Sequence, residues 1–179
     1  MIEIVQRENP VLRATAKPVP QSEIGSTKLN TIIERMKRAL ARQKDGIAIA
    51  APQIGESLRL FVINGDLLAQ ADRRYKGPTG FLTFINPEII KRSRDRKEVE
   101  EGCLSVRWLY GKVNRSTRVT LRALDEAGRP LERGGSGLLA QIFQHEVDHL
   151  EGILFIDKAR ELWEMDPAEI AELEAQNKD

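Results

Sequence analysis

The chain has 179 residues, of which 41% are hydrophobic and 31% charged, and its formal net charge is +1. This length suits one domain with a sizeable core, and the composition argues against a disordered chain or a nucleic-acid-binding surface. No apolar run approaches the roughly 20 residues that span a bilayer. Cys103 is the single cysteine, so no intramolecular disulfide can form. We therefore expect a soluble cytoplasmic protein in one domain, residues 1–179.

The apolar pattern along the chain predicts helices at both ends and strands between them. Residues 27–44 show apolar side chains at helical spacing, and residues 137–150 do so again. A short acidic C-terminal helix is predicted over 166–179, with Asp166 as its N-cap. This order predicts an α+β fold with a mostly antiparallel sheet packed around the helix at 137–150. The predicted strands are 58–64, 81–90, 98–106 and 117–125, followed by a turn at 125–128.

The helix at 137–150 carries a His-Glu-x-x-His pattern. His145 and His149 are four residues apart, so both imidazoles share one face and can reach one metal ion. Glu146 projects about 100° away, where it could act as a general base without being a ligand. A chance match is the alternative. It is weakened because these are the chain's two histidines and they lie on the apolar face, where burial without a partner would be costly.

This reasoning does not settle which residue is the third metal ligand beside His145 and His149. In the metzincin pattern Gly152 fits the glycine, but Phe155 stands where a histidine is required and cannot bind metal. A thermolysin-like site would use a downstream glutamate, and three are available. Cys103 could supply a soft thiolate, although a lone cysteine is commonly a small buried hydrophobe. A zinc endopeptidase and a non-catalytic metal-binding module therefore remain as alternatives. The downstream glutamates are Glu169, Glu172 and Glu174.

Three segments in order resemble motifs of the peptide deformylase family. They are Gly46–Gln53, Glu101–Ser105 and Gln144–His149, and weaker similarity extends the resemblance over nearly the whole chain. The resemblance implies metal-dependent hydrolysis of the formyl group from the N-terminal N-formylmethionine of newly made polypeptides, with release of formate. It also favours the enzyme over the two alternatives.

The resemblance further implies a role for individual residues. Cys103, His145 and His149 would be the metal ligands, and Glu146 the proton shuttle. The side-chain amide of Gln53 and the backbone N–H of Leu104 would stabilise the developing oxyanion. A solvated strand position is the alternative for the glutamate of the second motif. The remaining matching positions would lie near the substrate pocket or the metal: Gly46, Ile47, Ala48, Glu101, Leu138 and Ile142.

The implied cofactor is one divalent metal ion, Fe2+ physiologically, with Zn2+, Ni2+ or Co2+ able to take its place. The expected partners are N-formylmethionyl peptides of nascent chains, in transient proximity to the ribosome, with no nucleic acid or membrane bound. We expect a monomer.

Two departures from the family pattern concern substrate preference. Ala48 replaces a glycine that would allow positive φ or a close approach of the substrate. The residues after Ser105 lack the proline that often follows there, and Trp108 and Tyr110 either form a substrate-side wall or simply pack.

Overall fold

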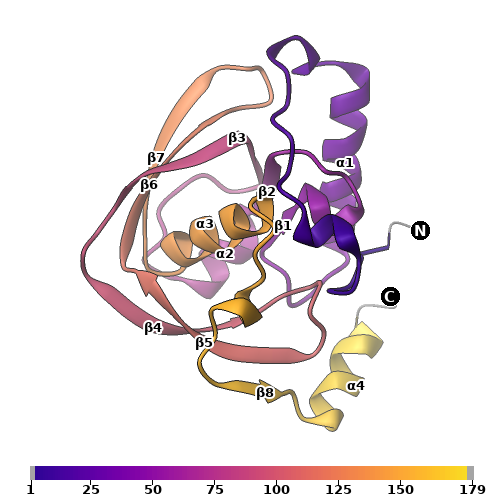
Figure 1. The fold of residues 1–179 in the computed structure, drawn as a ribbon, viewed down its shortest axis with the longest axis vertical. Coiled ribbons are helices and arrows are strands. Elements are labelled where there is room, and N and C mark those ends of the chain that lie inside the picture. The colour runs from indigo at the N-terminus through magenta and orange to yellow at the C-terminus, as the bar shows by residue number, and fades with distance from the viewer. Residues whose placement is uncertain (1–2, 177–179) are drawn as a thin grey trace.

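The computed structural model describes residues 3–176. Two antiparallel sheets form its framework, and helix α3 lies between them (Figure 1). The expected α+β fold, with the sheet packed around this helix, is confirmed. The elements in chain order are α1 Thr27–Ala41, β1 Ala48–Ala50, β2 Leu60–Asn64, α2 Gly65–Ala71, β3 Phe81–Arg92, β4 Arg96–Gly102, β5 Leu109–Ser116, β6 Arg118–Leu124, β7 Pro130–Ser136, α3 Gly137–Leu150, β8 Leu162–Glu164 and α4 Pro167–Gln176.

The larger sheet has the strand order β1-β2-β3-β6-β7, and the smaller one has β4-β5-β8. Strand β2 shows how the larger sheet is buried on both faces. Phe61 and Ile63 belong to the core against α3, whereas Leu60 and Val62 belong to the core against α1. Alternate side chains of a strand point to opposite faces, so this run of four buried residues serves two cores. The arrangement makes α3 the central helix and leaves β1 at the sheet's edge.

Helix α1 buries the apolar face that its periodicity predicts, and it ends three residues earlier than predicted. Ser26 caps its start, because its hydroxyl accepts a hydrogen bond from Leu29 N at 3.2 Å. At the other end Gln43 N donates to Leu40 O, and Gly46 N donates to Gln43 O. These turn contacts take the chain out of the helix before Lys44 and lead it into β1.

The strand predicted over 98–106 is wrong beyond Gly102. The chain turns sharply at Cys103, whose carbonyl accepts a hydrogen bond from Val106 N at 3.0 Å. The Cys103 sulfur also accepts from Ser105 N at 3.4 Å. These contacts replace strand pairing for residues 103–106, and the turn directs the Cys103 thiol toward α3.

The C-terminal segment begins as predicted. Asp166 caps α4, since its carboxylate accepts from Ala168 N at 2.8 Å. The helix is described as Pro167–Gln176 and has no buried residue, and the last residues of the predicted range 166–179 lie outside the described part of the chain. Within residues 3–176, no helix combines the length and apolarity needed to cross a membrane.

Candidate active site

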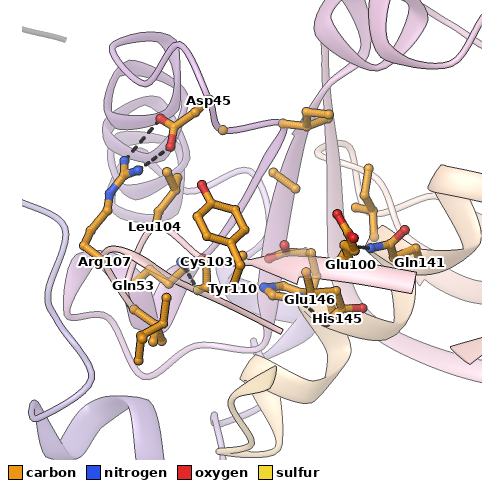
Figure 2. A pocket seen from close by; sticks show the side chains of 18 of the residues that line it. Asp45, Gln53, Glu100, Cys103, Leu104, Arg107, Tyr110, Gln141, His145 and Glu146 are labelled. Atoms are coloured by element: carbon orange, nitrogen blue, oxygen red, sulfur yellow. Dashed lines mark hydrogen bonds and ion pairs between the residues drawn. The ribbon is translucent and has the colours of Figure 1, made fainter. Parts of the chain in front are cut away.

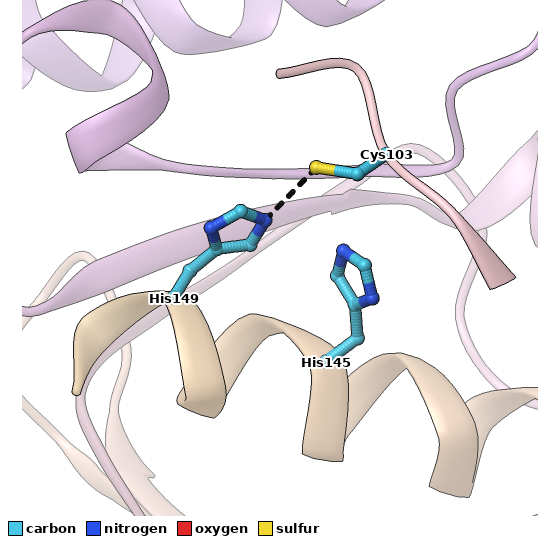
Figure 3. Close-up of side chains that lie close together, drawn as sticks. All are labelled: Cys103, His145 and His149. Carbon is cyan, nitrogen blue, oxygen red and sulfur yellow. Dashed lines mark hydrogen bonds between the residues drawn. The ribbon is translucent and has the colours of Figure 1, made fainter. Parts of the chain in front are cut away.

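Helix α3 and the turn after β4 bring together one sulfur and two imidazoles (Figure 3). Cys103 Sγ lies 3.2 Å from His149 Nε2, and the ring centroids of His145 and His149 are 4.9 Å apart. One donor atom from each of the three residues lies within 4.8 Å of the others. In residues 3–176 no other trio of histidine, cysteine or acidic side chains meets in this way. The downstream glutamates that sequence reasoning left open lie on α4, away from this group.

The donor set fits a divalent transition metal. A thiolate and two neutral imidazoles suit Zn2+ or Fe2+, and a catalytic site of this kind leaves a further position for water or substrate. His145 and His149 are both largely buried, so a metal would compensate polar groups that water cannot reach. Beside them Glu146 is 3% exposed, and its Oε2 has no hydrogen-bond partner among the described residues. A buried carboxylate oxygen without a partner is what a water-activating base would show.

A buried ion-pair network fixes the orientation of His145. Glu101 Oε2 lies 3.1 Å from His145 Nδ1, which leaves the Nε2 side of the ring for the metal. Arg115 binds both oxygens of Glu101 at 2.8 Å and also donates to Asp148 at 2.6 Å. Lys158 donates to the other oxygen of Asp148 at 2.7 Å. Glu101 is therefore a buried partner of a histidine and not a solvated strand residue.

Sequence reasoning missed Arg115. The signal that could have revealed it is its position on β5, where every second residue, Gly111, Val113 and Arg115, lies on the buried face. An arginine at a buried strand position requires a charged partner. Asp148 supplies part of that charge and forms ion pairs with both Arg115 and Lys158.

The network and the burial of the site shift the pKa values of its acidic and basic groups. Burial alone would raise the pKa of Glu101, but hydrogen bonds from Arg115 and His145 outweigh it and bring this pKa to about 2. Burial opposes the charged form of His145, yet hydrogen bonds with Cys103 and Glu101 raise its pKa well above the usual value. Burial raises the pKa of Glu146 to about 7. Cys103 and Glu101 thus make the surroundings of His145 favourable to positive charge, whether it is carried by the imidazole or by a cation bound to the neutral ring. Glu146 can gain or lose a proton near neutrality.

Gln53 points its amide nitrogen at the thiol. Its Oε1 accepts a hydrogen bond from Ala50 N at 2.8 Å, which fixes the amide orientation. Its Nε2 lies 3.2 Å from Ser105 Oγ and 3.5 Å from Cys103 Sγ. The amide N–H group is therefore held beside the Cys-His-His group by contacts on both sides.

A cleft opens over this group, and all the residues expected near the substrate line it (Figure 2). Trp108 and Tyr110 also line it, so they form a wall of the cleft. Ala48 pairs with Ile63 in regular antiparallel register, and it is not among the positive-φ residues of the described chain. Its backbone therefore does not need the freedom of a glycine. The expected residues that line the cleft are Gly46, Ile47, Ala48, Glu101, Leu138 and Ile142.

Two glycines allow neighbouring side chains to pack closely around the cleft. A Cβ on Gly46 would lie 2.8 Å from Leu104 Cδ1, and one on Gly102 would lie 2.5 Å from Tyr110 Cε1. Both distances are shorter than Cβ contacts normally allow. The glycines of the first two motifs thus serve close packing around the cleft.

The fold and this cleft define a class of protein, a mononuclear metallohydrolase with its cation site at the base of a cleft. The sequence model described as polypeptide deformylase matches residues 1–164, and the chain belongs to that family. It is accordingly a metal-dependent hydrolase that removes the formyl group from the N-terminal N-formylmethionine of new polypeptides.

Individual relatives agree with the family assignment. A peptide deformylase of Halothermothrix orenii is 40% identical over 158 residues, which cover 88% of this chain and 93% of the relative. The crystal structure of a Thermotoga maritima peptide deformylase matches with a TM-score of 0.77 and 35% identity, covering 90% of this chain and 99% of that one. A class I type b peptide deformylase of Acinetobacter baumannii, solved with Met-Ala-Ser bound, matches with a TM-score of 0.78 and 32% identity, covering 88% and 98%.

Proposed function

We propose that Cys103, His145 and His149 hold one divalent cation, physiologically Fe2+, at the base of the cleft. The convergence of the three donor atoms within 4.8 Å carries this proposal. The same donors would also accept Zn2+, Ni2+ or Co2+. When bound, the cation supplies Lewis acidity that makes water a nucleophile near neutral pH and polarises a carbonyl oxygen.

Glu146 is the proton carrier in this proposal. Its pKa of about 7 lets one carboxylate oxygen take a proton from the attacking water and then give it to the leaving nitrogen. Water oxygen bonds to the formyl carbon, the carbon–nitrogen bond breaks, and the products are formate and a free amino terminus. The Glu146 oxygen without a hydrogen-bond partner supports this role.

Gln53 and the backbone N–H of Leu104 are the proposed donors to the formyl oxygen as negative charge develops on it. The amide of Gln53 is already oriented by Ala50 and Ser105, so little reorganisation is needed during the reaction. Removing one such donor typically lowers the rate by roughly 10²–10³.

The substrate is proposed to lie along the free edge of β1. Among residues 3–176 this strand pairs only with β2, and residues 46–48 line the cleft. An extended peptide can add to such an edge through backbone hydrogen bonds. The methionine side chain would then enter the apolar part of the cleft beside Leu138 and Ile142. Binding of Met-Ala-Ser by the Acinetobacter baumannii relative supports a peptide of this kind.

The proposed setting is the cytoplasm, where a monomer would act on N-formylmethionyl nascent chains during transient proximity to the ribosome. A lone cysteine used as a metal ligand suits a reducing compartment. We propose that residues 1–179 form one catalytic domain, with the acidic segment 166–179 as a peripheral helix.

A paired assay tests the proposed function. The anaerobically purified protein is incubated with formyl-Met-Ala-Ser and, separately, with an unformylated protease substrate. We expect stoichiometric release of formate and Met-Ala-Ser with no peptide-bond cleavage. Cleavage of the unformylated substrate would instead support an endopeptidase, and no reaction with either would support a non-catalytic metal-binding module.

A further inference from the structure

An ion pair joins the two walls of the cleft at the end where β1 begins (Figure 2). One wall contributes Asp45, directly before the cleft residues of the first motif. The other contributes Arg107, from the turn after Cys103. Both terminal guanidinium nitrogens of Arg107, Nη1 and Nη2, donate to the Asp45 carboxylate, and Nη2 also donates to Gln43 Oε1 at 2.8 Å. The side chains of Arg107 and Asp45 are only 18% and 16% exposed, so this pair is partly shielded from water.

Other contacts hold Arg107 in place on its own wall. Its guanidinium carbon lies 4.3 Å from the centroid of the Trp108 ring, within range of a cation–π interaction. Its backbone N–H donates to Gln6 Oε1 at 3.3 Å. Trp108 O in turn accepts from Met165 N at 3.0 Å, beside β8. Arg107 is therefore anchored on its own side, and its contacts with Asp45 and Gln43 connect that side to the other wall.

This inference rests on the proposed function, in which the peptide substrate lies along the edge of β1. A peptide bound in that way passes the Arg107–Asp45 pair. Gln53 follows β1, and as the proposed donor to the formyl oxygen it lies at the end of the cleft where the formyl group binds. Asp45 precedes β1 and so lies at the opposite end of this strand. An extended peptide along β1 advances about 3.3 Å per residue, so the residues after methionine run toward Asp45. The methionine side chain leaves in the other direction, toward Leu138 and Ile142 at the apolar part of the cleft.

We propose that the Arg107–Asp45 ion pair is a positioning element for the residues that follow formylmethionine. It fixes the separation of the cleft walls where the second and third residues of the substrate bind. Fixing a site in its bound geometry lowers the cost of ordering it on binding. In the described part of the chain, the hydrogen bonds of Arg107 reach none of the proposed catalytic groups or metal ligands. Its contribution is therefore made equally to substrate and transition state and is measured in KM.

The experiment compares substrates of two lengths, formyl-Met-Ala-Ser and formylmethionine amide. For Arg107→Ala and Asp45→Asn we expect KM for the tripeptide to rise about tenfold, equivalent to about 1.4 kcal/mol. We expect kcat to change by less than about twofold, and KM for formylmethionine amide to rise by less than about twofold. The exchanged pair, Asp45→Arg with Arg107→Asp, should recover most of the tripeptide KM.

Arg59→Ala is the matched control. The Arg59 side chain is also 18% exposed and pairs with Glu151 at 2.6 Å, but neither residue lines the cleft. We expect this variant to leave both KM values unchanged. Thermal unfolding of every variant is measured beside the kinetics. If Arg107→Ala does not fold, Arg107→Lys replaces it, because lysine keeps the charge but loses the two-nitrogen contact.

Equal KM changes for both substrates, or no change for either, would overturn the positioning role. No recovery in the exchanged pair, when that variant folds, would also count against it. A wild-type protein that releases no formate from either substrate would overturn the proposed function as well. An active wild type whose tripeptide KM is unaffected by loss of the pair would overturn only this inference.

Discussion

Replacing Arg115 by methionine is expected to destabilise the protein and weaken metal binding together. Arg115 is 5% exposed and binds Glu101 through two hydrogen bonds of 2.8 Å and Asp148 through one of 2.6 Å. Methionine fills a similar volume but leaves two buried carboxylates without their shared cation. Removing one partner of a buried ion pair typically costs about 3–5 kcal/mol.

That cost is large beside the stability of the whole domain. Small domains are stable by about 5–15 kcal/mol, and each kcal/mol shifts Tm by about 2–4 °C in a chain of this length. We therefore expect Arg115→Met to lower Tm by about 6–20 °C. Because Glu101 orients His145, we also expect metal affinity to fall about 10- to 100-fold, as is typical when a group that orients a ligand is removed.

Calorimetric unfolding and metal titration of the same preparations measure both effects. Arg118→Met is the control, since the Arg118 side chain is 71% exposed and its contact with Asp95 is 3.6 Å long. If Arg115→Met unfolds within about 1 °C of this control, the buried network does not carry the stability assigned to it, because surface substitutions normally stay within about 0.5 kcal/mol. Unchanged metal affinity in Arg115→Met would show that the buried ion-pair network does not contribute to metal binding.

Three further variants test the proposed roles. Glu146→Gln should keep its metal and lose about 10²–10⁴-fold in kcat, measured by formate release, and near-normal turnover would remove Glu146 from proton transfer. Ser105→Ala removes the hydroxyl 3.2 Å from Gln53 Nε2 and should lower kcat/KM about fivefold, the equivalent of one ordinary hydrogen bond of about 1 kcal/mol. A much larger loss would mean that Ser105 does more than hold Gln53. Gly102→Ala places a Cβ 2.5 Å from Tyr110 and should cost about 1–3 kcal/mol in denaturant unfolding, and an unchanged midpoint would show that the ring moves freely aside.

The elements that the sequence predicts well are those in which the spacing of apolar side chains shows which face is buried. Helix α3 spans the predicted residues because its apolar and histidine positions repeat every three to four residues. Helix α1 shows the same repeat, and only its end is misplaced. Its last predicted residues join a turn whose hydrogen bonds depend on the chain that follows.

The elements that sequence missed depend on contacts between distant segments. Strand β5 carries Arg115 on its buried face, and β7 contains Gly134 and Gly135, so neither shows a clear apolar alternation. The turn at Cys103 could not be read from a run that looked strand-like through Val106. The sequence identified the residues of the Cys-His-His group through their motifs. It did not identify the contacts of Arg115 or the Arg107–Asp45 ion pair, because these join residues that are distant in sequence and meet only in the folded chain.

X-ray absorption spectroscopy of the anaerobically purified, metal-loaded protein tests the cation site most directly. One metal per chain is expected, with one sulfur and two imidazole nitrogens in its first shell. For zinc the expected distances are about 2.3 Å to sulfur and about 2.0–2.1 Å to nitrogen. Cys103→Ala should lose the sulfur scattering and most of the metal. A shell of oxygen and nitrogen alone in the wild-type protein, or an unchanged spectrum in the variant, would contradict the proposed ligand set.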